Sequence, residues 1–158
     1  MKYLVLCPGS RSGPLAFAAG GLSEFYDLEL ISSIDERSAA FLALGISAAT
    51  GKAAAVVTTS GSAVGNLLPA AIEADRSNHP LLLLTADRPH RLKNCGANQT
   101  VNQEEFLKPV CRSIELGPGK GFHLYSELEV KAFAGRAWQK CHEFPGPVHC
   151  NLHFEEPL

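Results

Sequence analysis

Short apolar runs alternate with segments of helical periodicity along the whole chain, and turns rich in glycine, serine and aspartate separate them. This alternation is typical of an α/β fold built on a parallel sheet. The early runs are continuously apolar, as expected of strands that are covered on both faces. We therefore predict a doubly wound, mostly parallel sheet of about six strands with helices on both faces. The predicted strands are residues 3–7, 28–32, 53–58, 80–86, 112–116 and 148–152.

Helical periodicity is clearest in three segments, residues 35–50, 62–77 and 126–142. Ser126 and Glu129 have the spacing of a capping box at the start of the last segment. We expect this helix to cover one face of the sheet, because its apolar residues recur at helical spacing. They are Val130, Phe133, Ala134, Ala137, Trp138 and Cys141.

Length and composition favour a single domain. The 158 residues, of which 46% are hydrophobic, are enough to bury one core, so we predict one domain over residues 1–158. The chain opens almost directly on a predicted strand, whereas a doubly wound sheet normally has a helix before it. We therefore expect that first helix to be absent and the chain to be trimmed.

Charge and residue content exclude several classes of function. A formal net charge of -2 predicts no basic surface for nucleic acid. The five cysteines form no C-x-x-C pair, which favours reduced thiols in a cytoplasmic protein. The six histidines show no metal-binding spacing, so we predict no metal site within the chain. No apolar run approaches the ~18 residues that a membrane span needs.

The turn after the first predicted strand, residues 8–14, is rich in glycine and serine and contains Arg11. In open parallel sheets ligands bind outside the carboxyl ends of the strands, so each of these turns is a candidate site. Free backbone amides and a guanidinium fork suit a carboxylate, although an ordinary strand-to-helix turn is the alternative. The spacing fits neither a nucleophile elbow nor a phosphate-binding loop.

Three further strand ends carry chemical groups. Glu36 follows the second strand, where it could instead form a capping box with Ser33. Thr59, Ser60 and Gly61 follow the third strand and suit an anion or a polar ring, with a plain helix cap as the alternative. The fourth strand is followed by Arg88 and a long polar loop that contains Asn98 and Gln99.

These groups are predicted to share one crevice edge, because the carboxyl ends of parallel strands meet at the same side of a sheet. Arg11 and Arg88 would supply two guanidinium forks, with Ser60 between them and Glu36 nearby. We expect a ligand that carries carboxylates and one group that requires a glutamate.

Five strings identify a resemblance that covers nearly the whole chain. They are L-C-P-G-S-R-S-x-P-L (residues 6–15), D-E-R (35–37), T-S-G-S-A-V-x-N (59–66), L-T-A-D-R-P (84–89) and C-G-A-N-Q (95–99). In this order they resemble the first domain of the thiamine-diphosphate (ThDP) synthases of the menaquinone pathway. The closing N-L-x-F-x-E-P-L (151–158) is similar to the end of that domain.

The resemblance implies a pyrimidine-binding domain of an enzyme that uses ThDP and Mg²⁺. Such an enzyme decarboxylates 2-oxoglutarate and adds the resulting succinyl carbanion equivalent to isochorismate, in menaquinone or phylloquinone biosynthesis. By this resemblance Glu36 is the catalytic residue and hydrogen-bonds N1′ of the aminopyrimidine. The resemblance also assigns Thr59, Ser60 and Gly61 to the cofactor, and Ser10, Arg11, Arg88, Asn98 and Gln99 to the substrates.

The metal ligands of the resembled enzymes lie in a diphosphate-binding domain with a G-D-G motif, and no such string occurs here. In that family this second domain comes from another subunit, which implies a homodimer or tetramer. We therefore expect this domain to be the N-terminal part of a longer enzyme, or one subunit of a split one, and the isolated chain to be inactive.

Two other functions stay open. The first is another ThDP enzyme of the acetolactate synthase or 2-oxo acid decarboxylase type, and Arg11, Arg88 and the A-N-Q loop argue against it. The second is a noncatalytic ligand-binding domain with the same fold, and the retention of Glu36 argues against it. A nucleotide-binding domain lacks every expected phosphate motif.

Overall fold

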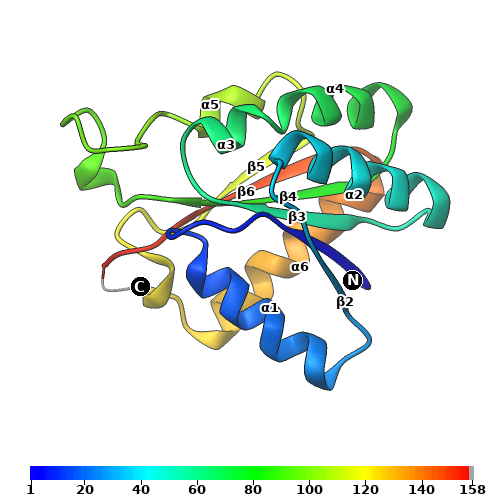
Figure 1. The fold of residues 1–158 in the computed structure, drawn as a ribbon, viewed down its shortest axis with the longest axis horizontal. Coiled ribbons are helices and arrows are strands. Elements are labelled where there is room, and N and C mark those ends of the chain that lie inside the picture. The colour runs from blue at the N-terminus through cyan, green and yellow to red at the C-terminus, as the bar shows by residue number, and fades with distance from the viewer. Residues whose placement is uncertain (157–158) are drawn as a thin grey trace.

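A six-stranded parallel sheet forms the centre of the fold (Figure 1), in a computed structural model that describes residues 1–156. The strand order is β2-β1-β3-β4-β6-β5, and every neighbouring pair is parallel. Each predicted strand is confirmed, with its ends within one residue of the observed ones. The strands are β1 (Tyr3–Leu6), β2 (Glu29–Ser32), β3 (Ala54–Thr58), β4 (Leu81–Asp87), β5 (Ser113–Leu116) and β6 (Pro147–His153).

Helices cover both faces of the sheet, which confirms the doubly wound class (Figure 1). One face carries α2 (Glu36–Thr50), α3 (Ser62–Gly65), α4 (Leu68–Ser77) and α5 (Glu104–Leu107). The other face carries α1 (Gly13–Phe25) and α6 (Glu127–Glu143). Two short 3₁₀ turns, η1 (His90–Leu92) and η2 (Phe122–Leu124), lie in the connections.

The core consists of two apolar layers, one on each face of the sheet. Successive strand residues point to opposite faces, so Val5 and Val56 join the layer under α2 and α4. Their neighbours Leu4 and Val57 join the layer against α6. β2 is the exception among the early strands, because it lies at the edge of the sheet and none of its residues is fully buried.

The helices differ from expectation at four places. The helices α1 and α5 were not predicted, and the segment 62–77 is two helices. Pro69 explains the break, because a proline ring removes an amide and clashes with the carbonyl four residues earlier, here that of Gly65. The capping box of α6 is confirmed at Ser126 and Glu129. Ala134 is exposed, so the predicted buried stripe of α6 is narrower there.

Candidate functional site

The strand order reverses between β1 and β3, because the chain passes from β1 to β2 on one side and returns to β3 on the other. Ligands of doubly wound folds bind at such a switch point. The turns that follow β1 and β3 touch there, since a Cβ added to Gly9 would lie 2.5 Å from Cβ of Thr59. The turn that carries Arg11 and the turn that carries Ser60 therefore adjoin.

Glu36 is the first residue of α2 and is half-buried at this edge. The capping box with Ser33 is wrong, because Asp35 caps the helix and its carboxylate accepts from the amide of Ser38 at 2.7 Å. The Glu36 carboxylate instead accepts from Nδ2 of Asn66 at 3.0 Å, through its Oε2. Within residues 1–156 its Oε1 makes no hydrogen bond.

The negative charge of Glu36 affects the thiol of Cys7, which directly follows β1. Burial raises the pKa of the Cys7 thiol to about 11, and the carboxylates of Glu36 and Asp35 add to this increase. Cys7 is therefore a neutral core thiol and no nucleophile at neutral pH. The turns after β1 and β2 thus bring a half-buried carboxylate, Glu36, beside the switch point.

Ser60, Arg88 and Gln99 form a latch between the third turn and the long loop. The Ser60 hydroxyl donates to the Gln99 carbonyl at 3.0 Å, and the Gln99 amide donates back to the Ser60 carbonyl at 2.9 Å. Nη1 of Arg88 donates to Oγ of Ser60 and, at 2.8 Å, to the same Gln99 carbonyl. Three of the predicted site residues therefore contact one another directly.

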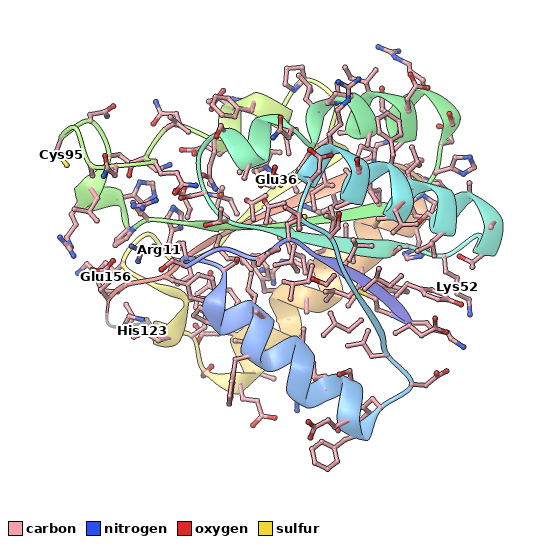
Figure 2. All side chains as sticks on the ribbon, viewed as in Figure 1. Arg11, Glu36, Lys52, Cys95, His123 and Glu156 are labelled. Atoms are coloured by element: carbon pink, nitrogen blue, oxygen red, sulfur yellow. The ribbon has the colours of Figure 1, made fainter. Side chains whose placement is uncertain are left out.

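Arg11 is 5% exposed and binds the last described segment of the chain (Figure 2). Its Nη1 donates to the carbonyl of Phe154 at 3.0 Å, and its Nη2 pairs with Oε1 of Glu156 at 2.6 Å. Its buried Nε has no partner within residues 1–156. Burial, followed by the charge of Arg11, lowers the pKa of Arg88, so the two guanidinium groups lie near each other.

Ser10 and Asn98 are exposed on the same edge of the sheet and take no part in the latch. Asn98 contributes its backbone carbonyl, which accepts from the hydroxyl of Thr100 at 3.1 Å. The structure thus gathers Ser60, Arg88 and Gln99 into one cluster and brings Arg11 close to it. Pro157 and Leu158, the last letters of the closing string, lie outside the described residues.

Sequence reasoning missed a buried polar network beneath the latch. Oδ2 of Asp87 accepts from the amide of Asn151 at 2.8 Å and pairs with Lys93 at 3.1 Å. Lys93 also binds Glu104 at 2.6 Å. A signal for it exists in the sequence, because Asn151 is a polar residue inside a predicted strand, where a buried amide requires a partner.

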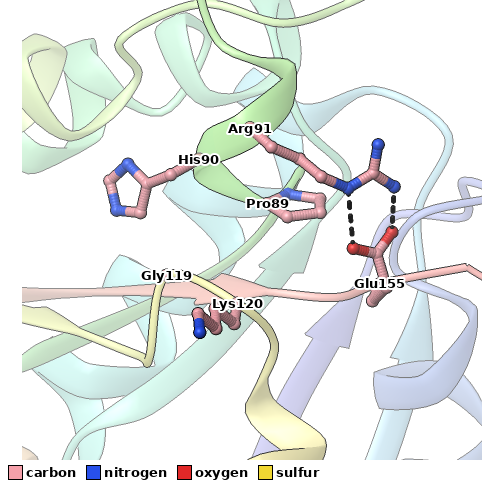
Figure 3. Close-up of a pocket in the computed structure, with 6 residues that line it drawn as sticks. All are labelled: Pro89, His90, Arg91, Gly119, Lys120 and Glu155. Atoms are coloured by element: carbon pink, nitrogen blue, oxygen red, sulfur yellow. Dashed lines mark hydrogen bonds and ion pairs between the residues drawn. The ribbon is translucent and has the colours of Figure 1, made fainter.

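One cavity lies near this region, and a second lies away from it. One of about 530 Å³ is lined by Pro89, His90, Arg91, Gly119, Lys120 and Glu155 (Figure 3). Arg91 and Glu155 form an ion pair at this cavity through two hydrogen bonds. Nε of Arg91 donates to Oε2 of Glu155 at 3.0 Å, and Nη2 donates to Oε1 at 2.6 Å. The other, of about 870 Å³, lies where the strands begin, at Tyr3 and Ala53. Neither is lined by a predicted site residue.

None of the helices described for residues 1–156 is both long and apolar enough to cross a membrane. In the same part of the chain, no three histidine, cysteine, aspartate or glutamate side chains are grouped so that they could hold a metal ion.

The chain is similar to known proteins over its full length. It is 68% identical over all 158 residues to the 2-succinyl-5-enolpyruvyl-6-hydroxy-3-cyclohexene-1-carboxylate synthase of Prochlorococcus marinus strain MIT 9313. It is 65% identical to the protein of the same name from strain NATL1A, and 61% identical to that of Synechococcus sp. strain WH7803. The chain spans 27%, 26% and 27% of these relatives, respectively, so it corresponds to about a quarter of their length.

Residues 1–106 match the family model of the N-terminal TPP binding domain of thiamine pyrophosphate enzymes. This match covers β1 to α5 and therefore all of the strand ends described above. The doubly wound sheet and the cluster of polar groups at its switch point agree with that assignment. The chain belongs to the thiamine pyrophosphate enzyme family, as its N-terminal TPP binding domain.

Proposed function

We propose that this chain is the pyrimidine-binding part of a longer ThDP- and Mg²⁺-dependent synthase that joins 2-oxoglutarate to isochorismate. The observation that carries the proposal is the 68% identity, over every residue of the chain, to a relative named for the product of that reaction. The reaction releases CO₂ from 2-oxoglutarate and forms a carbon–carbon bond to isochorismate. It belongs to the cytoplasmic biosynthesis of menaquinone or phylloquinone.

The residues of this edge fit an aminopyrimidine. Glu36 offers a carboxylate oxygen, Oε1, that makes no hydrogen bond within residues 1–156, while Asn66 holds the other oxygen in place. The turn of Thr59, Ser60 and Gly61 packs directly against the long loop, since a Cβ added to Gly61 would lie 2.6 Å from Cγ of Gln99. When bound, ThDP supplies the electron sink that stabilises the carbanion left by decarboxylation.

Glu36 is the proposed catalytic residue. With ThDP bound, the Glu36 carboxylate would hold a proton at N1′ of the aminopyrimidine. A fixed carboxylate is needed for this, and the position of Glu36 is fixed by α2 on one side and by Asn66 on the other. The Mg²⁺ ligands are proposed to lie in the diphosphate-binding domain of the longer enzyme.

The substrate side is proposed to be Ser10, Arg11, Arg88, Asn98 and Gln99. Both substrates are dicarboxylates, and guanidinium groups bind carboxylates through two parallel hydrogen bonds. Arg88 is partly exposed at the edge, and its positive charge is close to that of Arg11. Since the Arg11 guanidinium already binds Phe154 and Glu156, Arg88 is the better candidate for direct contact.

The proposed partner is the diphosphate-binding domain of a second subunit, in a homodimer or tetramer. Exposed apolar side chains on α2 and just before it support such a partner, because Ile34 is 91% exposed, Leu42 43% and Phe41 40%. Contiguous exposed apolar groups mark interaction surfaces in proteins. The two domains together would enclose the cofactor between them.

The test uses the chain alone and a longer enzyme made by joining it to the remaining segment of the 68%-identical relative. Calorimetric titration with ThDP and Mg²⁺ should give no binding to the chain alone and binding to the longer enzyme. The longer enzyme should consume isochorismate with 2-oxoglutarate but not with pyruvate. Formation of acetolactate from pyruvate, with no isochorismate consumed, would instead support a synthase of the acetolactate type.

The role of Glu36 is tested by Glu36→Gln in the longer enzyme. We expect kcat to fall about a hundred-fold or more, as for the loss of a general acid–base group, while ThDP still binds. Glu143→Gln is the matched control, because Glu143 is exposed at the end of α6. Unchanged turnover in Glu36→Gln would refute the catalytic assignment and favour a ligand-binding domain.

A further inference from the structure

Gln103 is a fully buried amide that follows the long loop after β4 and immediately precedes α5. Its Oε1 accepts from the backbone amide of Gly61 at 2.9 Å. Its Nε2 donates to Oδ1 of Asn151 at 2.7 Å and to the carbonyl of Ala86 at 3.0 Å. The side chain therefore binds the third turn with its oxygen and the ends of β4 and β6 with its nitrogen.

The chemistry of this position requires an amide. Only a side chain that both accepts and donates hydrogen bonds can bind the backbone amide of Gly61 and the side-chain carbonyl of Asn151 together. Each of these groups is buried with Gln103, and a buried polar group without a partner is costly.

The same contacts continue to Arg88. Nδ2 of Asn151 donates to Oδ2 of Asp87 at 2.8 Å, and Oδ1 of Asp87 accepts from the backbone amide of Arg88 at 2.8 Å. One unbroken series of hydrogen bonds thus runs from Gly61 through Gln103, Asn151 and Asp87 to Arg88. On the surface above, the latch of Ser60, Gln99 and Arg88 joins the same two segments.

We propose that Gln103 is a positioning residue that fixes the Ser60–Gly61 turn relative to Arg88. The inference deepens the proposed function, since it rests on the turn binding the cofactor and on Arg88 binding a substrate carboxylate. Gln103 is buried beneath the turn and acts through the Gly61 amide and through Asn151. Removing it frees the Gly61 amide, and leaves the latch and the β3–β4 pairing, which ends at Thr58 and Thr85, to hold the two segments in register.

The decisive variant is Gln103→Met, which keeps the length of the side chain and removes all of its hydrogen bonds. In the chain itself, hydrogen exchange of the Gly61 amide should become at least about ten-fold faster, because that amide loses its acceptor. In the longer enzyme, the Kd for ThDP and the KM for 2-oxoglutarate should each rise about ten-fold. We expect kcat to change less than either, because Gln103 does not touch the reacting atoms.

Ser126→Ala separates positioning from simple loss of stability. It weakens the cap of α6, far along the chain from the turn, and should leave Gly61 exchange and both constants unchanged. Gln103→Glu keeps the oxygen that faces Gly61 and loses the donor to Asn151. It should therefore retain slow exchange at Gly61 and still raise the KM for 2-oxoglutarate.

Three outcomes overturn the proposal. The first is a folded Gln103→Met chain with unchanged exchange at Gly61, and the second is a longer enzyme with unchanged Kd and KM. If Gln103→Met does not fold, the unsubstituted chain still provides the third: rapid exchange of the Gly61 amide would show that the bond to Gln103 does not hold the turn. An unsubstituted longer enzyme that consumes no isochorismate would refute the proposed function, and the exchange result would stand apart from it.

Discussion

Gly61 combines an unusual backbone conformation with a close contact. Its φ is +80°, a backbone conformation that residues with a side chain rarely adopt. An added Cβ would also lie 2.6 Å from Cγ of Gln99. Gly61→Ala should therefore lower the free energy of unfolding by about 2–3 kcal/mol and displace the Gln99 loop. Urea unfolding of the chain measures the first effect.

Gly135→Ala is the control for this change. Gly135 lies on the exposed face of α6, with nothing within 4 Å of an added Cβ. Alanine there should stabilise the chain by about 0.5–1 kcal/mol, because glycine is a poor helix former. Equal destabilisation by the two variants would show that the turn imposes no special demand on Gly61.

His149 should make stability depend on pH. Burial lowers its pKa to about 4, although the charge of Glu104 opposes the shift. The unfolded chain then binds a proton below about pH 6.5 that the folded chain refuses, so stability is lost as the pH falls from there towards 4. Between pH 6.5 and 5 the loss should be about 2 kcal/mol, measured by urea unfolding at each pH.

The variant His149→Gln should remove most of this pH dependence. In the unsubstituted chain, Nε2 of His149 lies 2.7 Å from the hydroxyl of Thr85, so a polar replacement preserves a partner for that hydroxyl. A smaller slope will remain from His153, whose pKa is lowered mainly by burial. An unchanged slope would mean that His149 is protonated in the folded chain.

At the residue scale, the sequence predicted where the site residues lie in the fold better than which residues they contact. Glu36, Ser60 and Arg88 were placed correctly at strand ends, because a strand end is a local property of the chain. The capping role of Glu36 was wrong, because a competing local signal, Asp35, occupies the cap. The bond between Gln103 and Gly61 could not be predicted, since it joins residues 42 positions apart whose pairing depends on the packed sheet.

At the scale of elements, the strands and helices with the clearest apolar pattern were the ones predicted correctly. The strands are short apolar runs with polar turns at each end, and the structure confirms them. α1 was missed because three glycines and a proline obscure its periodicity, and because Ala19 is its only fully buried residue. Proline is tolerated there because Pro14 lies in the first turn, where an amide has no helical partner.

The capping box of α6 gives a prediction for an element. The Ser126 amide donates to the Glu129 carboxylate at 2.8 Å, and the Ser126 side chain accepts from the Glu129 amide. Ser126→Ala should lower the free energy of unfolding by about 1 kcal/mol, the usual cost of a lost N-cap. Chemical denaturation measures it, with Ser77→Ala at the exposed end of α4 as control.

Ser77→Ala should change the stability by less than about 0.5 kcal/mol, because it removes no cap. A loss of the same size in each variant would show that the box contributes nothing specific. A loss in Ser126→Ala well above 2 kcal/mol would indicate that the start of α6 also supports the aromatic cluster of Phe122, Tyr125 and Phe133.

At the scale of the whole molecule, the fold brings the first turn against the end of the last strand. Arg11 and Phe154 are 143 residues apart, and a single guanidinium joins them. Sequence reasoning assigned Arg11 to the substrates because no other partner was visible in the local pattern. The structure supplies such a partner, so Arg11 has a structural role whatever it does toward a ligand.

Arg11→Met tests this link between the two ends of the fold. The variant keeps the apolar stem and removes a charged hydrogen bond to the Phe154 carbonyl, so the free energy of unfolding should fall by about 2–3 kcal/mol. Glu156→Gln should cost less than about 1 kcal/mol, because the Glu156 side chain is 68% exposed and its ion pair is screened by water. Urea unfolding and limited proteolysis after β6 measure the two effects. An unchanged unfolding midpoint in Arg11→Met, together with a raised KM for 2-oxoglutarate in the longer enzyme, would instead assign Arg11 to the substrate.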